Sequence, residues 1–494
     1  MKELLLGIDI GTSACKVAAF DADGRVLAQS NQPYSVYYPH PGWAEQDAEE
    51  WWAAVCKGIR DVLSKPDIHA ADILCIGLDG QSWSAIPVDE KGSALARTPI
   101  WMDTRSREIC DRYRSQLGED TVFRIAGNDF LPSYTAPKMI WFRENCPEIY
   151  RQASYFLQSN SFIAMKLTGT ASQDVSQLYG LQFFNLRKME MDTGLASELG
   201  IDPNLIPERF ACDAIIGAVT EEAFRLTGLL QGTPVVAGGL DAACGTLGAG
   251  VYRPGQTQEQ GGQAGGMSIC MGSALAHKAL ILSPHVVPGL FLLQGGTVGG
   301  GGALKWFRQE FGGGKSFDNL TAEAENIPAG SDGVVFLPYM AGERSPIWNP
   351  DAKGVFYGLG YDKTRAHMIR AVLEGVAFAL EHNLRVAAEV GAEVSDLNAM
   401  GGASNSALWT QIKADVTGKV FHVPRSDTAT TLGAAILAGV GSGVYGSYQE
   451  AVNRTVSVTK TYTPDPENHA VYRKRMDLYL SLYQNLKSVF SDFA

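Results

Sequence analysis

The sequence predicts an α/β protein built from two domains. The chain has 494 residues, more than one ordinary domain of about 150 residues contains. Patterns typical of strands and of helices alternate along it, as they do in α/β folds. Near the middle, at residues 232–250, a buried-strand pattern is followed by a glycine-rich segment. We therefore predict an N-terminal domain over residues 1–244 and a C-terminal domain over residues 245–494.

The first thirty residues predict a β-meander. LLLGIDI and CKVAAFD have strand patterns joined by a Gly-Thr-Ser turn, and an Asp-Ala-Asp-Gly turn leads into RVLAQS. A helical pattern follows at residues 45–63, and an apolar strand, ILCIGLDG, at residues 73–80. Two more helical patterns occupy residues 135–145 and 161–167. This alternation indicates an α/β domain.

The second half contains a looser echo of the N-terminal pattern. Residues 267–282, MSICMGSALAHKALIL, again predict a strand, a glycine-containing turn and a strand. The echo indicates either an internal duplication or a chance similarity of two hairpins, and the sequence leaves both open. A glycine tract at residues 295–302 precedes the helical pattern ALKWFRQEF, and the clearest helical pattern covers residues 364–390. Near the end, LNAMGGASNSALWTQIKADVTG places a glycine pair between a strand and a helix.

Composition narrows the classes of function. Apolar residues make up 45% and charged residues 19% of the chain, enough for a large core. With 53 acidic against 41 basic residues the net charge is −12, which argues against a nucleic-acid partner, because phosphate backbones attract positive charge. No apolar run reaches the roughly 18 residues of a membrane span, and MKELLLGIDIG lacks the apolar region and cleavage site of a signal peptide. We expect a soluble, cytoplasmic protein without a membrane partner.

Cysteine and histidine form no metal-binding or nucleophilic pattern. The eight cysteines are scattered singly, without a CxxC pair, and no HxxxH motif indicates a metal site. We interpret the cysteines as reduced thiols, mostly in the core. Neither a Ser-His-Asp order nor a nucleophile elbow is present.

The segment GIDIGTSACK is the first candidate for chemistry. It places Asp9 at the end of a buried strand, directly before a turn of Gly11, Thr12 and Ser13. A carboxylate there can face a metal ion, the turn can hold phosphate through its N–H groups and hydroxyls, and Lys16 can add a positive charge. The alternative is an ordinary hairpin in which Asp9 caps the turn. The segment is neither a P-loop nor a dinucleotide-binding fingerprint.

Three further glycine clusters adjoin predicted strand ends or helix starts. They lie at Gly272, at residues 299–302 and at Gly401 and Gly402. Glycine turns and helix N-termini bind phosphate and let the backbone approach a flat base closely. Each cluster alone can be a simple bend. Together with the first turn they favour a nucleotide held between two α/β domains.

Asp241 follows a buried strand at the expected junction of the domains. Phosphoryl transfer to an alcohol needs a carboxylate that accepts the proton of the attacking hydroxyl. Asp241 also suits a helix N-cap, because AACGTLGAG follows it. The two roles are compatible.

Two polar and aromatic segments, GLDGQSWS and IWMDTRS, indicate a site for a small polyol. Gln81, Trp83, Trp101, Asp103 and Arg105 offer an amide, a carboxylate and a guanidinium for hydroxyl groups and indole rings for the carbon face. Tryptophan and arginine also pack in ordinary cores. For Trp101 and Arg105 that alternative stays open.

The order of these motifs resembles that of the FGGY carbohydrate kinases, within the actin-like and hexokinase-like ATPase superfamily. The resemblance covers nearly the whole chain and rests on GIDIGTSACK, EQDAEEWW, IWMDTR, SYTAPKMIWFREN, GGLDAACGTLGAG and GVFYGLGYDKTRAHMIRAVLE. SYTAPKMIWFREN resembles the first signature of the family, and the last of these segments resembles the second. The resemblance implies two ribonuclease-H-like α/β domains with ATP and sugar in the cleft between them. It also implies closure of the domains during turnover, which excludes water.

The resemblance implies roles for individual residues, position by position. Asp241 is the expected base, and Asp9 is expected near a magnesium ion. The terminal phosphates are expected beside Gly11, Thr12, Ser13 and Lys16, a second phosphate turn at Gly272 and Ser273, a third glycine turn at Gly301, and the adenosine beside Gly401, Gly402 and Ser406. The sugar is expected to contact Gln81, Ser82, Trp83, Trp101, Asp103, Arg105 and Asp241. Homodimers are common in the family, so a homodimer is compatible with the resemblance.

Within the family, the chain length, EQDAEEWW and the GQ-containing loop look most like those of the xylulokinases. Two positions depart from that pattern. Xylulokinases usually carry Gly-Gln-Met-His-Gly, whereas this chain has Gly-Gln-Ser-Trp-Ser, so Trp83 stands in place of a sugar-contacting histidine. Their usual Asp-Asn is Asp241-Ala242 here, which removes an amide. A change of hydrogen-bonding partners alters which hydroxyl groups a site favours.

The leading hypothesis is an ATP- and Mg²⁺-dependent kinase that phosphorylates a terminal hydroxyl of a ketopentose, with D-xylulose as the first candidate. Alternatives of the same class are kinases for ribulose, erythritol, gluconate or glycerol. Glycerol is less favoured, because glycerol kinases usually carry Gln-Arg-Glu where this chain has Gly-Gln-Ser. An alternative of another class is a non-catalytic regulator that binds ATP or sugar, against which Asp9, Lys16 and Asp241 argue.

Overall fold

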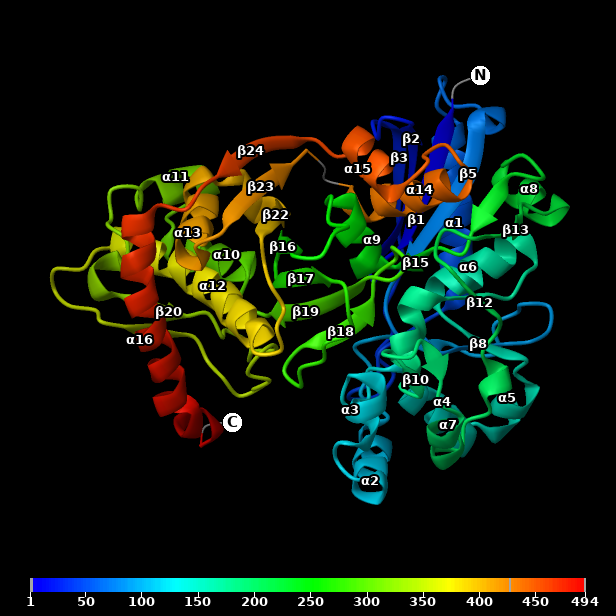
Figure 1. Cartoon of the computed structure of the whole chain (residues 1–494), viewed down its shortest axis with the longest axis horizontal. Coiled ribbons are helices and arrows are strands. Elements are labelled where there is room, and N and C mark those ends of the chain that lie inside the picture. Colours follow the sequence, from blue (N-terminus) through cyan, green and yellow to red (C-terminus); the bar gives the residue numbers. More distant parts are fainter. Residues whose placement is uncertain (1–2, 426–427, 493–494) are drawn as a thin grey trace.

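The computed structural model describes residues 3–425 and 428–492, which form two lobes around two seven-stranded sheets (Figure 1). The strand order of the first sheet is β13-β14-β5-β1-β2-β3, with β15 also paired to β5, and that of the second is β18-β19-β17-β16-β22-β23-β24. The first sheet contains β1 (Leu4–Ile10), β2 (Ala14–Asp21), β3 (Val26–Pro33), β5 (Ile73–Gly80), β13 (Ile215–Ala218), β14 (Pro234–Val236) and β15 (Gly239–Leu240). The second contains β16 (Gln256–Gly261), β17 (Gly265–Met271), β18 (Ile281–Pro284), β19 (Phe291–Thr297), β22 (Asp396–Met400), β23 (Val420–Pro424) and β24 (Val458–Tyr462).

Helices cover both sheets. The first lobe contains α1 (Ala48–Leu63), α2 (Arg107–Leu117), α3 (Thr121–Ala126), α4 (Thr135–Asn145), α5 (Pro147–Gln152), α6 (Ser159–Thr168), α7 (Thr193–Leu199), α8 (Glu221–Thr227) and the 3₁₀ segment η2 (Val175–Leu181). Later in the chain come α9 (Asp241–Gly248), α10 (Gly301–Phe311), α11 (Phe317–Ala322), α12 (Arg365–Ala388), η5 (Gly402–Asn405), α13 (Ala407–Thr417), α14 (Ala429–Gly441), α15 (Tyr448–Thr455) and α16 (Pro466–Ser491). In the part of the chain that the structure describes, no helix is both long enough and apolar enough to cross a bilayer.

The predicted N-terminal meander is confirmed. β1, β2 and β3 form an antiparallel ladder, and β5, with the predicted bounds, lies parallel to β1. α4 also has the predicted bounds, and α6 begins two residues earlier than predicted. α1 begins three residues later, because Glu45 and Gln46 pair with β7 (Thr98–Pro99) as the short strand β4 and Asp47 caps the helix by accepting a hydrogen bond from the Glu49 N–H.

The second sheet repeats the topology of the first. β16, β17 and β19 form an antiparallel ladder like β1, β2 and β3, and β22 and β23 continue it with parallel strands, as β5 and β14 do beside β1. An internal duplication is therefore present, and both halves have the implied ribonuclease-H-like order. The repeat begins one strand earlier than predicted from residues 267–282, however. β17 corresponds to β2 rather than to β1, and β18 pairs with β19 and not with β17.

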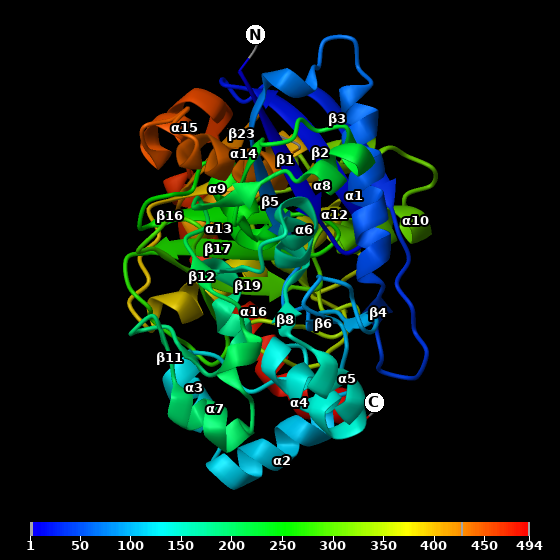
Figure 2. The same ribbon diagram turned by 90° about the vertical axis from the view of Figure 1, so that its right-hand side faces the viewer.

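Helices α9 and α14 lie where the two lobes meet. The predicted boundary after residue 244 falls inside α9. α14, from late in the chain, packs on β1, β5 and α9, on the face of the first sheet opposite to α1 (Figure 2). Glycines allow this approach, since a Cβ on Gly7 would lie 2.1 Å from the Thr431 carbonyl oxygen and one on Gly77 would lie 1.8 Å from that of Ala434. The seam between α14 and the first sheet has no room for a side chain at these positions.

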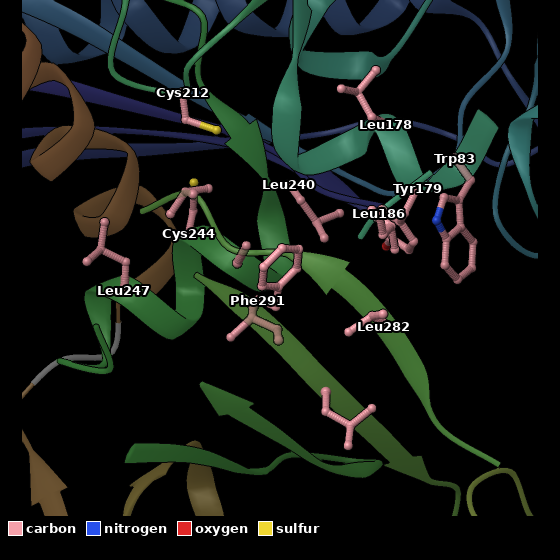
Figure 3. Close-up of a cluster of buried hydrophobic side chains, with 14 of the residues drawn as sticks. Trp83, Leu178, Tyr179, Leu186, Cys212, Leu240, Cys244, Leu247, Leu282 and Phe291 are labelled. Atoms are coloured by element: carbon pink, nitrogen blue, oxygen red, sulfur yellow. The ribbon is translucent and has the colours of Figure 1, made fainter. Parts of the chain in front are cut away.

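A hydrophobic core crosses the junction of the lobes (Figure 3). Leu240, Cys244 and Leu247 at α9 belong to the same cluster as Leu282 and Phe291 of the second sheet. All eight cysteines are free thiols and seven of them are buried, as predicted. This shared core packs α9 of the first half against the second sheet.

Candidate active site

Three carboxylates converge at the C-terminal ends of the central strands of the first sheet. Asp9 on β1 and Asp79 on β5 are direct register partners. Asp241 begins α9, directly after β15, which also pairs with β5. Lys16, the register partner of Asp9 on β2, donates to the Asp9 carboxylate at 3.2 Å, and the Thr430 hydroxyl donates to the same oxygen at 3.3 Å. The sequence predicted Asp9, Lys16 and Asp241 as site residues but missed Asp79.

The electrostatic environment of Asp241 suits a proton acceptor. Burial, and after it the negative charge of Asp9, raises the pKa of Asp241 to about 7. The Ala242 N–H, which donates to the Asp241 carboxylate at 2.6 Å, and the charge of Lys16 oppose this rise. Burial and the charges of Asp9 and Asp241 also hold the pKa of Asp79 well above its usual range. Leu240 occupies the N-cap position of α9, so the alternative interpretation of Asp241 as the cap is wrong.

The turn at residues 11–13 lies beside these carboxylates, between β1 and β2. The Thr12 hydroxyl accepts a hydrogen bond from the Trp101 indole N–H at 2.9 Å, and the Thr12 carbonyl accepts one from the Gln46 amide at 2.8 Å. Gln81, which is 1% exposed, donates to the Gln46 side chain at 2.7 Å. Gln81 and Trp101 therefore hold the turn in place, and neither is among the residues that line the cavity between the two lobes.

Asp103 and Arg105 are also corrections to the predicted sugar site. Their side chains form two hydrogen bonds with each other, at 2.9 and 2.8 Å. Asp103 also accepts from the Ala44 N–H at 2.7 Å, and Arg105 pairs with Glu45 at 2.8 Å and lies 3.7 Å from the Trp43 ring centre. Because both side chains are buried and bonded within the protein, they fix the IWMDTRS loop and are not free to bind a ligand.

A cavity of about 330 Å³, the interlobe cavity, opens between the two lobes. Of the predicted sugar ligands, Ser82 and Trp83 line it, and Asp241 adjoins it through Ala242. Trp83 has a φ of 59°, and its ring centre lies 4.3 Å from that of Tyr134 and 5.7 Å from that of Tyr179. Figure 3 shows Trp83 and Tyr179. The side chains that complete the wall are Tyr179, from η2, and Gln258, Gln260, Gln263, Met267, Ser268, Ile281, Gln294 and Arg344, from the second half of the chain.

Arg344 is the one charged side chain among the described residues that line the interlobe cavity. Glu343 fixes the backbone beside it by accepting hydrogen bonds from the N–H groups of Val298, at 2.6 Å, and Arg344, at 2.8 Å. Within the described residues the Arg344 guanidinium forms no hydrogen bond or ion pair. A guanidinium in this state can donate to the hydroxyl or carboxylate oxygens of a ligand. No sequence pattern pointed to Arg344, because only the fold brings AGERSPIWNP to this wall of the cavity.

A larger cavity of about 710 Å³, the second-lobe cavity, gathers the C-terminal glycine clusters. Gly301, Gly402 and Ser406, three of the predicted nucleotide residues, line it together with Lys305, Arg308 and Phe317. Gly262 and Gln263, in the turn between β16 and β17, line both this cavity and the interlobe cavity. This turn therefore separates the two cavities, and the start of α10 packs against it through a Gly301 N–H that donates to the Gly262 carbonyl at 2.8 Å.

Gly401 lies beside the same turn, but Gly272 and Ser273 do not. Gly401 has a φ of 83°, and a Cβ there would lie 2.8 Å from the Gly261 carbonyl oxygen. Gly272 and Ser273 follow β17 at the end opposite to that turn, about 20 Å along a seven-residue strand. The predicted second phosphate turn is thus misplaced. The turn at residues 261–265 stands where the residue 11–13 turn stands in the first sheet, because β16 and β17 correspond to β1 and β2.

The residues present suit a magnesium ion. Asp9 and Asp79 offer carboxylate oxygens, and in the described part of the chain no donor makes a hydrogen bond to either Asp79 oxygen. The described residues contain no group of three or more His, Cys, Asp or Glu side chains that could hold a metal. A site with one or two carboxylates leaves the other positions to water and phosphate oxygens, which is how proteins usually hold Mg²⁺.

Comparisons with known proteins agree with this architecture. The model for the N-terminal domain of the FGGY family of carbohydrate kinases matches residues 4–248, and the model for its C-terminal domain matches residues 266–442. A xylulose kinase from Staphylococcus epidermidis is 30% identical over 100% of this chain and 99% of its own. The structure of a xylulose kinase from Rhodospirillum rubrum superimposes with a TM-score of 0.92 at 29% identity, over 99% of this chain and 100% of the other. The structure of a gluconate kinase from Lactobacillus acidophilus superimposes with a TM-score of 0.93 at 25% identity, over 100% of both chains.

Proposed function

Because this chain belongs to the FGGY family of carbohydrate kinases and is a sugar kinase, we propose that it transfers the γ-phosphate of ATP to a terminal hydroxyl of D-xylulose. The observation that carries the proposal is the position of Asp241. Its carboxylate, with a pKa near neutrality, adjoins the interlobe cavity on one side and the Asp9–Lys16 pair on the other. Full-length matches to proteins named xylulose kinase support D-xylulose as the first substrate to test.

In this proposal the sugar occupies the interlobe cavity and the nucleotide occupies the second-lobe cavity. The terminal phosphates lie between the turns at residues 11–13 and 261–265, whose N–H groups stabilise their charge together with Lys16. Asp241 accepts the proton of the attacking hydroxyl of the sugar. The oxygen of this hydroxyl bonds to the γ-phosphorus of ATP, and the bond between that phosphorus and the bridging oxygen of ADP breaks. A magnesium ion held by Asp9 would neutralise phosphate charge when bound.

We propose that residues 1–244 and 245–494 act as two domains that close on the substrates. Support comes from the interlobe cavity, whose wall is built from both halves of the chain. α9 and α14 then form the connection about which the domains move, because both lie at the junction and pack on each other. Closure excludes water, which would otherwise accept the phosphoryl group.

A sugar acid is the second candidate substrate. The observation that favours it is the guanidinium of Arg344, which forms no hydrogen bond or ion pair within the described residues and lines the interlobe cavity. A carboxylate is the natural partner of such a group. The fold similarity to a protein named gluconate kinase points to the same class.

The test is a measurement of ADP release with Mg-ATP across a panel of D-xylulose, L-xylulose, ribulose, erythritol, glycerol and gluconate. The highest kcat/KM for D-xylulose is the expected result. The highest kcat/KM for gluconate would instead favour the sugar acid, with Arg344 as the residue that selects it. Asp241→Ala should lower turnover by about 10²–10⁴ while ATP binding is kept. ATP binding without sugar-dependent ADP release across the panel would refute the kinase proposal and favour the non-catalytic regulator.

A further inference from the structure

Asp79 is a buried carboxylate with no compensating hydrogen bond. Its side chain is 0% exposed, at the C-terminal end of β5. Neither of its oxygens accepts a hydrogen bond from any donor that the structure describes. A buried, unpaired carboxylate is expensive, so such a group in a native protein calls for an ion, a proton or a water that the chain itself does not supply.

A second buried aspartate shows what a structural carboxylate looks like in this protein. Asp174 is also 0% exposed, but it accepts hydrogen bonds from Ser176 at 2.5 Å, from Asn160 at 3.0 Å and from the Gln177 N–H at 3.0 Å. Hydrogen bonds from the surrounding chain therefore offset part of the cost of burying this carboxylate. Asp79 has no such partners, so a purely structural role does not explain why an aspartate stands there.

Another carboxylate lies beside Asp79 on the neighbouring strand. Asp9 is its register partner on the neighbouring parallel strand, so both side chains lie on the same face of the sheet. Lys16 compensates Asp9, at 3.2 Å, but the Lys16 side chain is 56% exposed and, within the described residues, forms no hydrogen bond with Asp79. Two carboxylates side by side repel each other, and a cation placed between them would turn this repulsion into binding.

We propose that Asp79 is a second carboxylate ligand, beside Asp9, of the divalent cation that accompanies the nucleotide. The inference rests on the proposed function, because the cation enters with ATP. The donor set consists of oxygens alone, and with two protein ligands it leaves coordination positions for water and for phosphate oxygens. Magnesium and manganese(II) both prefer such a site.

Mn²⁺ provides the probe, because electron paramagnetic resonance distinguishes free from bound Mn²⁺ without any turnover. The full-length protein is titrated with MnCl₂ in the presence of ADP and without sugar, as wild type, Asp79→Asn, Asp9→Asn and Asp174→Asn. We expect Mn²⁺ binding to weaken by about tenfold or more in Asp79→Asn and in Asp9→Asn, and to stay within about twofold of wild type in Asp174→Asn.

The unfolding temperature without metal is a second measurement. A structural role of Asp79 predicts a lower unfolding temperature for Asp79→Asn, whereas a role as a metal ligand does not. Asp79→Asn should unfold at the same or a higher temperature than wild type, because the amide removes the cost of holding an ionisable group in a buried position and can donate to Asp9. Asp174→Asn, the equally buried control, should unfold at a lower temperature, because Asn160 loses its acceptor.

The outcomes separate this inference from the proposed function. If Asp9→Asn weakens Mn²⁺ binding and Asp79→Asn does not, Asp79 is no ligand and only this inference fails. A lower unfolding temperature of Asp79→Asn with unchanged Mn²⁺ affinity would overturn it in the same way, in favour of a structural carboxylate. Wild-type protein that binds no Mn²⁺ with ADP would overturn both this inference and the magnesium site of the proposed function.

Discussion

Acidification should protonate Asp241, the proposed base, within the range from pH 8 to pH 6. With the pKa of Asp241 at about 7, about nine tenths of this carboxylate is ionised at pH 8 and about one tenth at pH 6. The base must be ionised to accept a proton, so kcat/KM for the sugar should fall about tenfold from pH 8 to pH 6. Since burial is the largest cause of the raised pKa and the charge of Asp9 the next, the effect belongs to the position of Asp241 in the cleft.

Lys16 offers a way to move the midpoint of this pH dependence. Its positive charge lowers the pKa of Asp241, so Lys16→Met should shift the acid limb of the profile to higher pH, in addition to weakening ATP binding. The assay is ADP release at saturating Mg-ATP from pH 5.5 to 8.5, in a buffer series of constant ionic strength. Asp241→Asn, measured in the same series, should lose about 10²–10⁴ in turnover at every pH.

Glu343 is the group that could mimic this profile. Burial raises its pKa to about 7 as well, and it lies beside the cavity-lining Arg344. Glu343→Gln is the matched control, because the amide oxygen can still accept from the N–H groups of Val298 and Arg344. If the fall of kcat/KM at low pH disappears in Glu343→Gln, the titrating group is Glu343 and not Asp241. A wild-type midpoint below pH 5.5 would show that Asp241 is not the titrating base.

Three further predictions concern the seam and the cavity walls. Gly77→Ala should destabilise the fold by about 1–3 kcal/mol, because its Cβ would lie 1.8 Å from the Ala434 carbonyl oxygen, and calorimetry should show a lower Tm. The control is Gly272→Ala, whose Cβ would lie 3.5 Å from its nearest neighbour. This control should leave Tm and the KM for ATP unchanged. Arg344→Met should raise the KM for the sugar about tenfold or more and change the KM for ATP by less than about twofold, and equal effects on both would argue against a contact with sugar. Trp83→His should change the ratio of kcat/KM values across the substrate panel by about tenfold, since this side chain lines the interlobe cavity, and an unchanged ratio would exclude Trp83 from specificity.

Local sequence patterns predicted those parts of the first lobe in which neighbouring strands are joined by short turns. The meander of β1, β2 and β3 follows from alternating apolar residues and two turns rich in Gly, Thr, Ser and Asp. Asp9 and Asp241 could be found because Asp9 lies near the end of an apolar strand and Asp241 directly follows one, and a strand end fixes where a side chain emerges. The same reasoning reached Gly301, Gly402 and Ser406, which lie at the starts of elements around one cavity.

Other predictions failed because a residue type alone does not say whether its hydrogen bonds are already used. Asp103 and Arg105 have the chemistry of a sugar site, but they bind each other and Glu45, which comes from far earlier in the chain. Gly272 is not a phosphate turn because the repeat begins with β16, one strand earlier than predicted, so the turn that corresponds to residues 11–13 is at residues 261–265. A signal for the correct turn was present, since GGQAGG connects two strands as the Gly-Thr-Ser turn connects β1 and β2.

The two departures from the usual family pattern now have a physical context. Trp83 and Ala242 come from the first half, and they face Gln258, Gln294 and Arg344 from the second half across one cavity. A wall without an amide at position 242 therefore still contains amides and a guanidinium from the opposite lobe, so the cavity keeps hydrogen-bonding capacity for a sugar. Such a sugar contacts both lobes at once, and the free energy of its binding then also favours closure. Substrate preference in this enzyme should for that reason depend on both halves of the chain, and exchanging Trp83 alone should change preference without restoring the usual pattern in full.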